Sequence, residues 1–350
     1  MTKRDGLVAV LIFVLTLVAS DWSATSPARA NAADTLLING AGATFPNPIY
    51  AKWFDEYHKS HPHIEINYQS IGSGGGIRQL LAGTVDFGAS DMPMTDEQLQ
   101  QAKTKILHFP TVLGAVVPTY NVPGVTQELK FTPEVLAGIF LGTVTKWNDS
   151  NLAKANAGTK LPANDIILVH RSDGSGTTFV WTDYLSKVSS EWKAKVGAGA
   201  SVSWPTGLGG KGNEGVAGLV KQTPYSFGYV ELIYAIQNRM AYGMVGNSSG
   251  AFVKADLNSV TKAAAAVATT MPDDFRVSIT NPPGRDAYPI ASFTWLLIPT
   301  TISDTAKKSA ITDFLRWMLQ DAQKMTEQLS YAPLPHEVVT KEAKLISQIH

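Results

Sequence analysis

Short polar side chains and one arginine stand in four glycine-containing loops of this sequence. The loops cover residues 40–45, 72–76, 89–91 and 171–177. The hydroxyl groups that we expect to bind a ligand belong to Thr44, Ser73, Ser175 and Thr177, and the guanidinium group belongs to Arg171. Hydroxyls are compact hydrogen-bond donors, and a guanidinium can donate two parallel hydrogen bonds to one oxyanion. Three of the loops lead into predicted helices, so unpaired backbone N–H groups can join them. The set predicts a site for a tetrahedral oxyanion.

Two aspartates in these loops have different expected roles. A carboxylate such as Asp91 repels an anion unless the anion carries a proton that the carboxylate can accept. Phosphate keeps such a proton near neutral pH, because the second pKa of a phosphate group is about 6, whereas fully ionised sulfate has none. Asp91 should therefore reject sulfate, on the order of a thousandfold in affinity. Asp173 can either hold the guanidinium of Arg171 in place or cap the following helix.

Strands and helices must position these loops, and the two alternate along the chain. The predicted strands cover residues 36–38, 64–69, 85–89, 166–169 and 292–298. The predicted helices begin near Pro48, within 72–76, at 132–134, at Phe179 and near Ile311. This alternation predicts an α/β fold with mostly parallel sheets flanked by helices. Such sheets bind ligands beyond the carboxyl ends of their strands, where the loops lie.

The length of 350 residues suits two domains rather than one. A turn at residues 121–124 gives a boundary, and we expect the last helix to return to the first lobe. The first lobe would then be discontinuous, with residues 31–119 and 289–350, and the second lobe would contain residues 120–288. We expect hinges near Thr119-Tyr120 and Tyr288-Pro289, with the ligand bridging the lobes.

The N-terminus predicts export from the cytoplasm. Lys3 and Arg4 precede an apolar run over residues 7–17, and the small residues of 28–30 suit a signal peptidase. The run is shorter than the ~20 residues that a membrane span needs. We expect a signal peptide over residues 1–30, with other cleavage sites between residues 24 and 33 left open. The chain has no cysteine, so no lipoprotein anchor is expected, and the protein is predicted to act outside the cytoplasm.

Composition and weak motifs argue against other classes of protein. Lys+Arg and Asp+Glu both number 29, so no basic field attracts nucleic acid. His58, His61 and His63 stand where a helix should end in a solvent-facing turn, so we expect no metal site. Residues 209–212 resemble a phosphate-binding P-loop, but glycine follows the lysine where Ser or Thr is needed. We expect neither a cofactor nor nucleotide binding.

Five segments together resemble one known family. They cover residues 40–46, 68–76, 85–91, 171–177 and 207–213. In this order they are similar to the periplasmic phosphate-binding protein of the ABC-type phosphate importer, and the similarity runs through nearly the whole chain after the signal peptide. The resemblance implies a two-lobed periplasmic-binding-protein fold of type II that closes on phosphate in the cleft. It also implies a non-enzymatic receptor, expected to be a monomer, that delivers phosphate to permease and ATPase subunits.

The resemblance also assigns ligand contacts. Carried over by position, they are Thr44, Phe45 (through its N–H), Ser73, Asp91, Arg171, Ser175, Gly176 and Thr177, with Asp173 behind Arg171. Two alternatives stay open. One is a secreted phosphatase-like hydrolase with Ser73 or Ser175 as nucleophile, although no histidine is a motif-supported base and His170 is only nearby in sequence. The other is a receptor for a different oxyanion, such as arsenate or sulfate.

Overall fold

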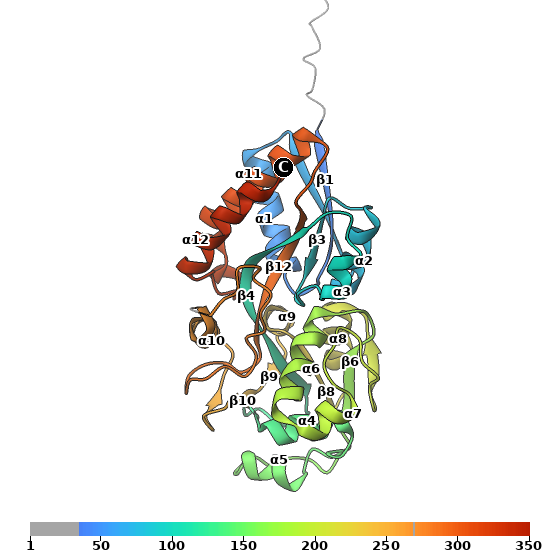
Figure 1. The fold of residues 1–350 in the computed structure, drawn as a ribbon. Helices are drawn as coiled ribbons and strands as arrows, with labels where there is room; N and C mark the ends of the chain where they lie inside the picture. The colour runs from blue at the N-terminus through green and yellow to red at the C-terminus, as the bar shows by residue number, and fades with distance from the viewer. Residues whose placement is uncertain (1–34, 269) are drawn as a thin grey trace, which may run out of the picture. The chain divides into compact units, whose positions relative to one another are not determined.

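A single long strand, β4 (Ile106–Asn121), joins two halves of the main sheet (Figure 1). The structure is a computed structural model that describes residues 35–268 and 270–350. The strand order is β2-β1-β3-β12-β4-β8-β6-β7, and β9 also pairs with β4. β4 pairs with β12 up to Ala115 and with β8 from Val116 onward. We call the strands on the β12 side the first half-sheet and those on the β8 side the second half-sheet.

Each half-sheet contains three parallel strands. The strands of the first half-sheet are β1 (Leu36–Gly42), β2 (Ile64–Ser70), β3 (Phe87–Ser90) and β12 (Ala291–Pro299). Those of the second are β6 (Ile167–Arg171), β7 (Leu208–Gly210), β8 (Ser226–Glu231) and β9 (Ala241–Tyr242). A small separate sheet contains β5 (Lys130–Phe131), β10 (Met244–Gly246) and β11 (Phe252–Val253). β1 is parallel to β2 and β3, and β6 is parallel to β7 and β8. The central strands β12 and β4 add antiparallel pairs to the predicted parallel ones.

Helices cover both faces of the first half-sheet. They are α1 (Asn47–Ser60), α2 (Ser73–Ala82), α3 (Asp96–Gln100), α11 (Thr305–Gln320) and α12 (His336–Leu345), with 3-10 turns at Ala322–Met325, Glu327–Leu329 and Ile346–Gln348. Phe54 of α1 contacts Phe87 of β3 and Phe314 of α11, with ring centroids 6.1 and 5.5 Å away. At the next residue of β3, a Cβ on Gly88 would lie 3.3 Å from Leu80 of α2. Because successive residues of a strand face opposite sides, α2 covers the other face.

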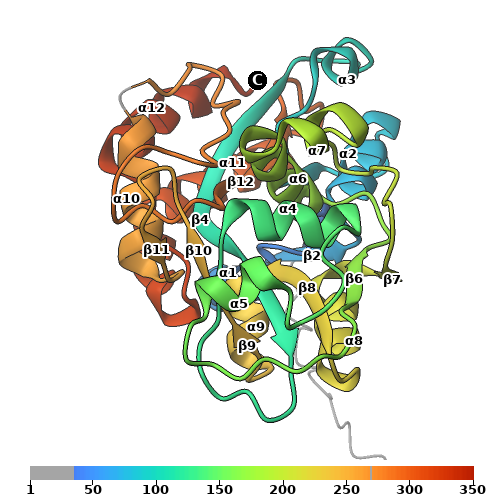
Figure 2. The same cartoon turned by 90° about the horizontal axis from the view of Figure 1, so that it is seen from below.

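The second half-sheet is covered in the same way. The helices between β5 and β12 along the chain are α4 (Pro133–Leu141), α5 (Ser150–Ala155), α6 (Gly176–Val188), α7 (Ser190–Lys195), α8 (Gly212–Gln222), α9 (Leu232–Gln237) and α10 (Leu257–Ala268). Tyr229 of β8 stacks on Trp181 of α6 at 5.1 Å, whereas the adjacent Gly228 faces Val220 of α8. Figure 2 shows α4 and α6 on one side of β6 and β8, and α8 on the other.

Several predicted boundaries are confirmed, and one strand is longer than predicted. Thr132 caps α4 by accepting the N–H of Val135 at 3.3 Å, and Gly83 ends α2 with φ +72°. The sequence indicated only an apolar segment over residues 112–117, but β4 has 16 residues. Pro110 lies inside it, although proline donates no hydrogen bond. The β4–β12 register shifts opposite Pro110, between Thr294 and Trp295, and this irregularity accommodates the missing donor.

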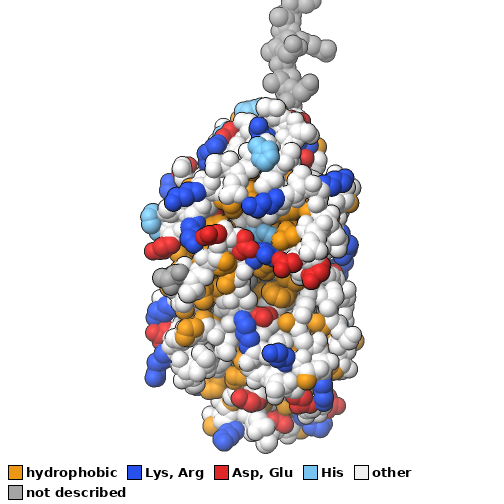
Figure 3. All heavy atoms as spheres, viewed as in Figure 1, with side chains coloured by type: hydrophobic (Ala, Val, Ile, Leu, Met, Phe, Trp, Pro, Cys, Tyr) orange, Lys and Arg blue, Asp and Glu red, His pale blue; other side chains and the backbone are white. Residues whose placement is uncertain are grey.

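Charged side chains are mixed on the surface. On the face in Figure 3, acidic and basic groups alternate rather than forming one large patch of either sign. Arg276, for example, contacts both Asp96 at 2.7 Å and Asp274 at 2.8 Å. Within the described ranges no helix is long and apolar enough to span a membrane. The predicted signal peptide lies outside the described residues, and the predicted lobe boundaries stay a prediction.

Candidate oxyanion site

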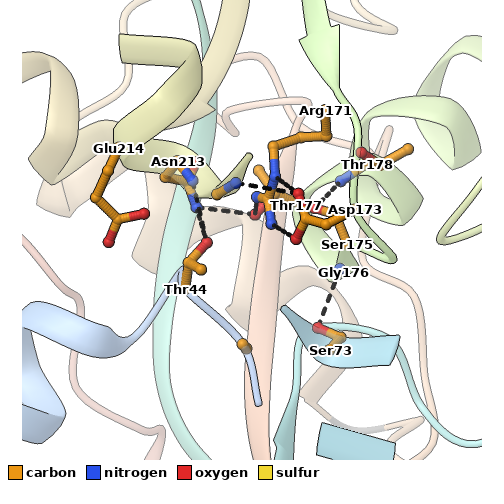
Figure 4. A network of polar contacts seen from close by, with 12 residues as sticks. Thr44, Ser73, Arg171, Asp173, Ser175, Gly176, Thr177, Thr178, Asn213 and Glu214 are labelled. Atoms are coloured by element: carbon orange, nitrogen blue, oxygen red, sulfur yellow. Dashed lines mark hydrogen bonds and ion pairs between the residues drawn. The ribbon is translucent and has the colours of Figure 1, made fainter. Parts of the chain in front are cut away.

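The predicted loops meet where the two half-sheets join. Strands β1, β3 and β6 end at Gly42, Ser90 and Arg171, and the loops after them converge (Figure 4). The side chains brought together there are each at most 2% exposed: Thr44, Ser73, Asp91, Arg171, Ser175 and Thr177. The carboxyl edge of parallel strands is the expected place for a ligand.

The guanidinium group of Arg171 is held by the carboxylate of Asp173. Its Nε donates to Asp173 Oδ1 at 2.7 Å and its Nη2 to Asp173 Oδ2 at 2.6 Å. Burial alone would raise the pKa of Asp173, but the hydrogen bonds and charge of Arg171 outweigh it and lower that pKa. The helix that follows is capped instead by Ser175, whose Oγ accepts the N–H of Thr178 at 3.0 Å. Of the two roles left open for Asp173, this geometry favours the support of Arg171.

Two hydroxyl groups of the site can act only as donors. Ser73 Oγ accepts the N–H groups of Asp91, at 3.2 Å, and Gly176, at 3.0 Å. Thr44 Oγ1 accepts the N–H of Asn213 at 3.2 Å and its Nδ2 at 2.8 Å. A hydroxyl oxygen has two lone pairs and one hydrogen. Since both lone pairs of each oxygen are occupied, each hydroxyl has only its hydrogen to offer, which suits an anion.

Thr177 links the arginine to the second carboxylate. Its Oγ1 accepts Arg171 Nη1 at 3.3 Å and Asn213 Nδ2 at 3.1 Å, and it donates to Asp91 Oδ2 at 3.5 Å. The other oxygen of Asp91, Oδ1, accepts the hydroxyl of Thr294 at 2.9 Å. Burial raises the pKa of Asp91 to about 7, against the opposing effects of Thr294 and Arg171. Asp91 can therefore change its protonation state near neutral pH.

Two predicted contacts use the backbone. Phe45 is fully buried, its carbonyl accepts the hydroxyl of Tyr331 at 2.6 Å, and among the described residues nothing accepts its N–H. The N–H of Gly176 donates to Ser73 in this structure, so its contact with a ligand stays a prediction. A Cβ at Gly176 would lie 2.6 Å from Asp91 Cβ, closer than real contacts allow. The two loops can approach this closely only because residue 176 is glycine.

Three further residues belong to the site, and the sequence did not single them out. Asn213 binds Thr44 and Thr177, Thr294 binds Asp91, and the backbone N–H of Glu231 donates to Asn213 Oδ1 at 2.9 Å. Glu231 is fully buried, and burial raises the pKa of its carboxyl well above the usual value. The sequence offered two signals for Asn213, which ends the family-like segment 207–213 and stands at the start of α8 after glycines. Thr294 is a single polar residue in an apolar strand.

The histidines lie away from this arrangement. The His170 ring stacks on Trp204 at 4.8 Å, and its Nδ1 lies 2.9 Å from the carbonyl oxygen of Arg171. Among residues 35–268 and 270–350, no histidine forms a hydrogen bond with Ser73 or Ser175. The same ranges contain no group of three His, Asp or Glu side chains that could hold a metal ion.

Comparison with known proteins shows which family this chain belongs to. A PBP superfamily domain matches residues 24–322. Phosphate-binding protein PstS of Pasteurella multocida is 46% identical over 342 residues, which cover 97% of this chain and 94% of that protein. This chain belongs to the PstS phosphate-binding protein family.

Further comparisons agree with this assignment. The PstS protein of Xylella fastidiosa strain Temecula1 is 45% identical to this chain over 323 residues. The aligned region covers 92% of this chain and 88% of that protein. A phosphate-binding protein from Stenotrophomonas maltophilia has a similar crystal structure, with a TM-score of 0.68 at 17% identity, over 88% of this chain and 93% of that chain. The resemblance and the periplasmic-binding-protein fold expected from the sequence are confirmed. PstS proteins are binding proteins and not enzymes.

Proposed function

We propose that this protein captures inorganic phosphate in the periplasm and delivers it to the permease and ATPase subunits of an ABC-type importer. The observation that carries the proposal is the convergence of Arg171 with two hydroxyls that can only donate, on Thr44 and Ser73, beside Asp91. Donors on several sides suit an anion, and one carboxylate suits an anion that still has a proton. Phosphate meets both conditions near neutral pH.

The proposed ligand contacts come from both half-sheets. From the loops of the first half-sheet they are Thr44, the N–H of Phe45, Ser73 and Asp91. From those of the second they are Arg171, Ser175, Gly176 and Thr177, and Asp173 orients Arg171 without touching the ligand. The hydroxyl of Thr177, which donates to Asp91 across 3.5 Å, would turn to a phosphate oxygen. Asp91 Oδ2 would then accept the phosphate proton.

Closure of two lobes would complete the site. We propose that residues 31–119 and 289–350 move as one lobe and residues 120–288 as the other. Two short contacts join loops of the two half-sheets: the N–H of Gly74 donates to Gly174 at 2.9 Å, and that of Gly176 donates to Ser73 at 3.0 Å. Phosphate binding to both sides would favour the closed arrangement, which the permease would then recognise.

Calorimetry combined with a turnover assay tests this proposal. Phosphate should bind with a one-to-one ratio and a Kd in the micromolar range, which corresponds to about 8 kcal/mol. The purified protein should release no p-nitrophenol from p-nitrophenyl phosphate. Turnover that disappears in Ser175→Ala would instead support the hydrolase alternative. Absence of phosphate binding by the protein without the predicted signal peptide would overturn the proposal.

A further inference from the structure

We propose that Asn213 is a positioning residue for phosphate, one that directs the ligand-binding hydroxyls and joins the two sides of the site. This inference rests on the proposed phosphate function. Asn213 is fully buried and is the second residue of α8, after Gly212 with φ +72°. The N–H of Gly212 donates to Asp173 Oδ1 at 3.0 Å. The carboxylate that orients Arg171 therefore also fixes the start of the helix that carries Asn213.

The amide of Asn213 has only one orientation that satisfies its neighbours. Its Oδ1 accepts the backbone N–H of Glu231 at 2.9 Å. A rotation of the amide by 180° would place its NH2 group against this N–H, donor against donor. The two hydrogens of Nδ2 must therefore point to the other side, where they meet Thr44 Oγ1 at 2.8 Å and Thr177 Oγ1 at 3.1 Å (Figure 4).

These two hydrogen bonds determine what the threonine hydroxyls can do. Thr44 Oγ1 also accepts the N–H of Asn213, so both of its lone pairs are occupied and its hydrogen is left for another acceptor. Among the described residues no group accepts that hydrogen. Without the amide of Asn213, the hydroxyl could rotate and use its hydrogen elsewhere. Asn213 thus converts Thr44 from a group that can donate or accept into a donor suited to an anion.

The same amide links the two sides of the site. Thr44 lies in the loop between β1 and α1, next to the first half-sheet, whereas Thr177 lies in the first turn of α6, next to the second. One NH2 group contacts both hydroxyls, so the pair of hydrogen bonds exists only while the loops are together. Asn213 should therefore favour the closed arrangement as well as orient the donors.

A double-mutant cycle in the protein without the predicted signal peptide, with inorganic phosphate as the ligand, tests this role. Asn213→Ala and Thr44→Val should each raise the phosphate Kd at least about tenfold, as expected for the loss of hydrogen bonds to a charged ligand. If Asn213 acts through Thr44, the double variant should bind about as weakly as the weaker single variant. Fully additive effects, or an unchanged Kd in Asn213→Ala, would overturn the inference.

Asn156→Ala is the matched control. Asn156 is 6% exposed and its side chain also makes three hydrogen bonds, two to Lys130 and one to Leu152. This variant should lose stability in phosphate-free thermal unfolding while its phosphate Kd stays unchanged. Failure of the wild-type protein to bind phosphate would refute the proposed function, and not the role of Asn213 alone.

Asn213→Asp provides a second readout if the alanine variant does not fold. The new carboxylate would accept hydrogen bonds from Thr44 and Thr177, which turns both hydroxyls away from the ligand. Relative to wild type at the same pH, phosphate affinity should fall at least about 100-fold at pH 8 and recover in part at pH 5, where a protonated Asp again offers a hydrogen. A pH-independent deficit would contradict the inference.

Discussion

Two buried carboxyl groups in this protein have nearly the same exposure and very different surroundings. Asp91 is 1% exposed, and its two oxygens accept hydrogen bonds from Thr294 and Thr177. Glu342, on α12, is 0% exposed, and neither of its oxygens has a hydrogen-bond partner among the described residues. Burial raises the pKa of Asp91 to about 7, and it raises the pKa of Glu342 well above the usual value with nothing to oppose it.

The comparison shows that burial alone does not make a ligand-binding carboxylate. Removal from water disfavours the charged form of both groups, but hydroxyl donors and the charge of Arg171 compensate for part of that cost at Asp91. Asp91 can therefore ionise near neutral pH and accept a proton from phosphate, whereas burial favours the neutral acid form of Glu342 in the folded protein. Substitutions that remove a partner of Asp91, or the carboxyl of Glu342, test this contrast.

Arg171→Ala should have the largest effect, because it removes both the donor to the ligand and the charge that helps Asp91 to ionise. We expect the phosphate Kd to rise at least about 100-fold, since a charged hydrogen bond contributes ~1.5–3 kcal/mol and a guanidinium can form two. Calorimetry measures this change. Lys146→Ala, which breaks the exposed pair with Asp165, is the control and should leave the Kd unchanged. A rise of less than about tenfold in Arg171→Ala would mean that the anion site lies elsewhere.

Glu342→Gln should change stability and its pH dependence rather than binding. The unfolded protein releases the Glu342 proton above pH ~4.3, whereas the folded protein keeps it to a much higher pH. The folded state then binds more protons, so the free energy of unfolding falls as pH rises above ~4.3, by about 1.4 kcal/mol per pH unit up to the folded-state pKa.

Urea unfolding of wild type and Glu342→Gln at pH 4.5 and pH 8 measures this slope. The variant should lose part of the pH dependence and be the more stable protein at pH 8. Its phosphate Kd should equal that of wild type. An identical pH dependence in both proteins would show that Glu342 ionises in the fold and that the contrast with Asp91 is wrong.

The sequence could predict much of this site because its ligand groups stand in loops with local signals. Glycine-rich segments before helix starts led to Thr44, Ser73 and Ser175, and the structure brings them together with Arg171. Asn213 and Thr294 were missed because their partners are distant in sequence: Asn213 binds Thr44 across 169 residues, and Thr294 binds Asp91 across 203. No local pattern encodes such pairs.

Part of the fold could not be predicted from the sequence for a related reason. The full length of β4 could not be predicted, because Pro110 and Pro118 normally argue against a central strand. Their tolerance depends on the register irregularity opposite Pro110 and on pairing with β12 and β8, which lie far along the chain.

Thr294→Val should have the smallest effect and should move Asp91 toward the behaviour of Glu342. Loss of the hydroxyl removes a hydrogen bond that favours the carboxylate, so the pKa of Asp91 should rise above its value of about 7. A protonated Asp91 no longer repels sulfate. At pH 8, where wild-type Asp91 is mostly ionised, the variant should therefore bind sulfate roughly fourfold more tightly than wild type, as expected for a pKa raised by ~1 kcal/mol.

Sulfate calorimetry from pH 5 to pH 8 would measure this effect. Affinity for sulfate should increase as pH falls through the pKa of Asp91, and it should do so at a higher pH in Thr294→Val. Superimposable sulfate profiles in the two proteins would rule out control of Asp91 by Thr294.

The central claim is that the Asp91 carboxylate selects an oxyanion that carries a proton. Its most direct test is calorimetry of phosphate and sulfate at pH 8, in wild type and in Asp91→Asn. Because wild-type Asp91, with a pKa of about 7, is mostly ionised at pH 8, wild type should bind sulfate at least about tenfold more weakly than phosphate, and Asp91→Asn should bring the two Kd values close to each other. Equal affinity of the wild-type protein for both anions would contradict the account.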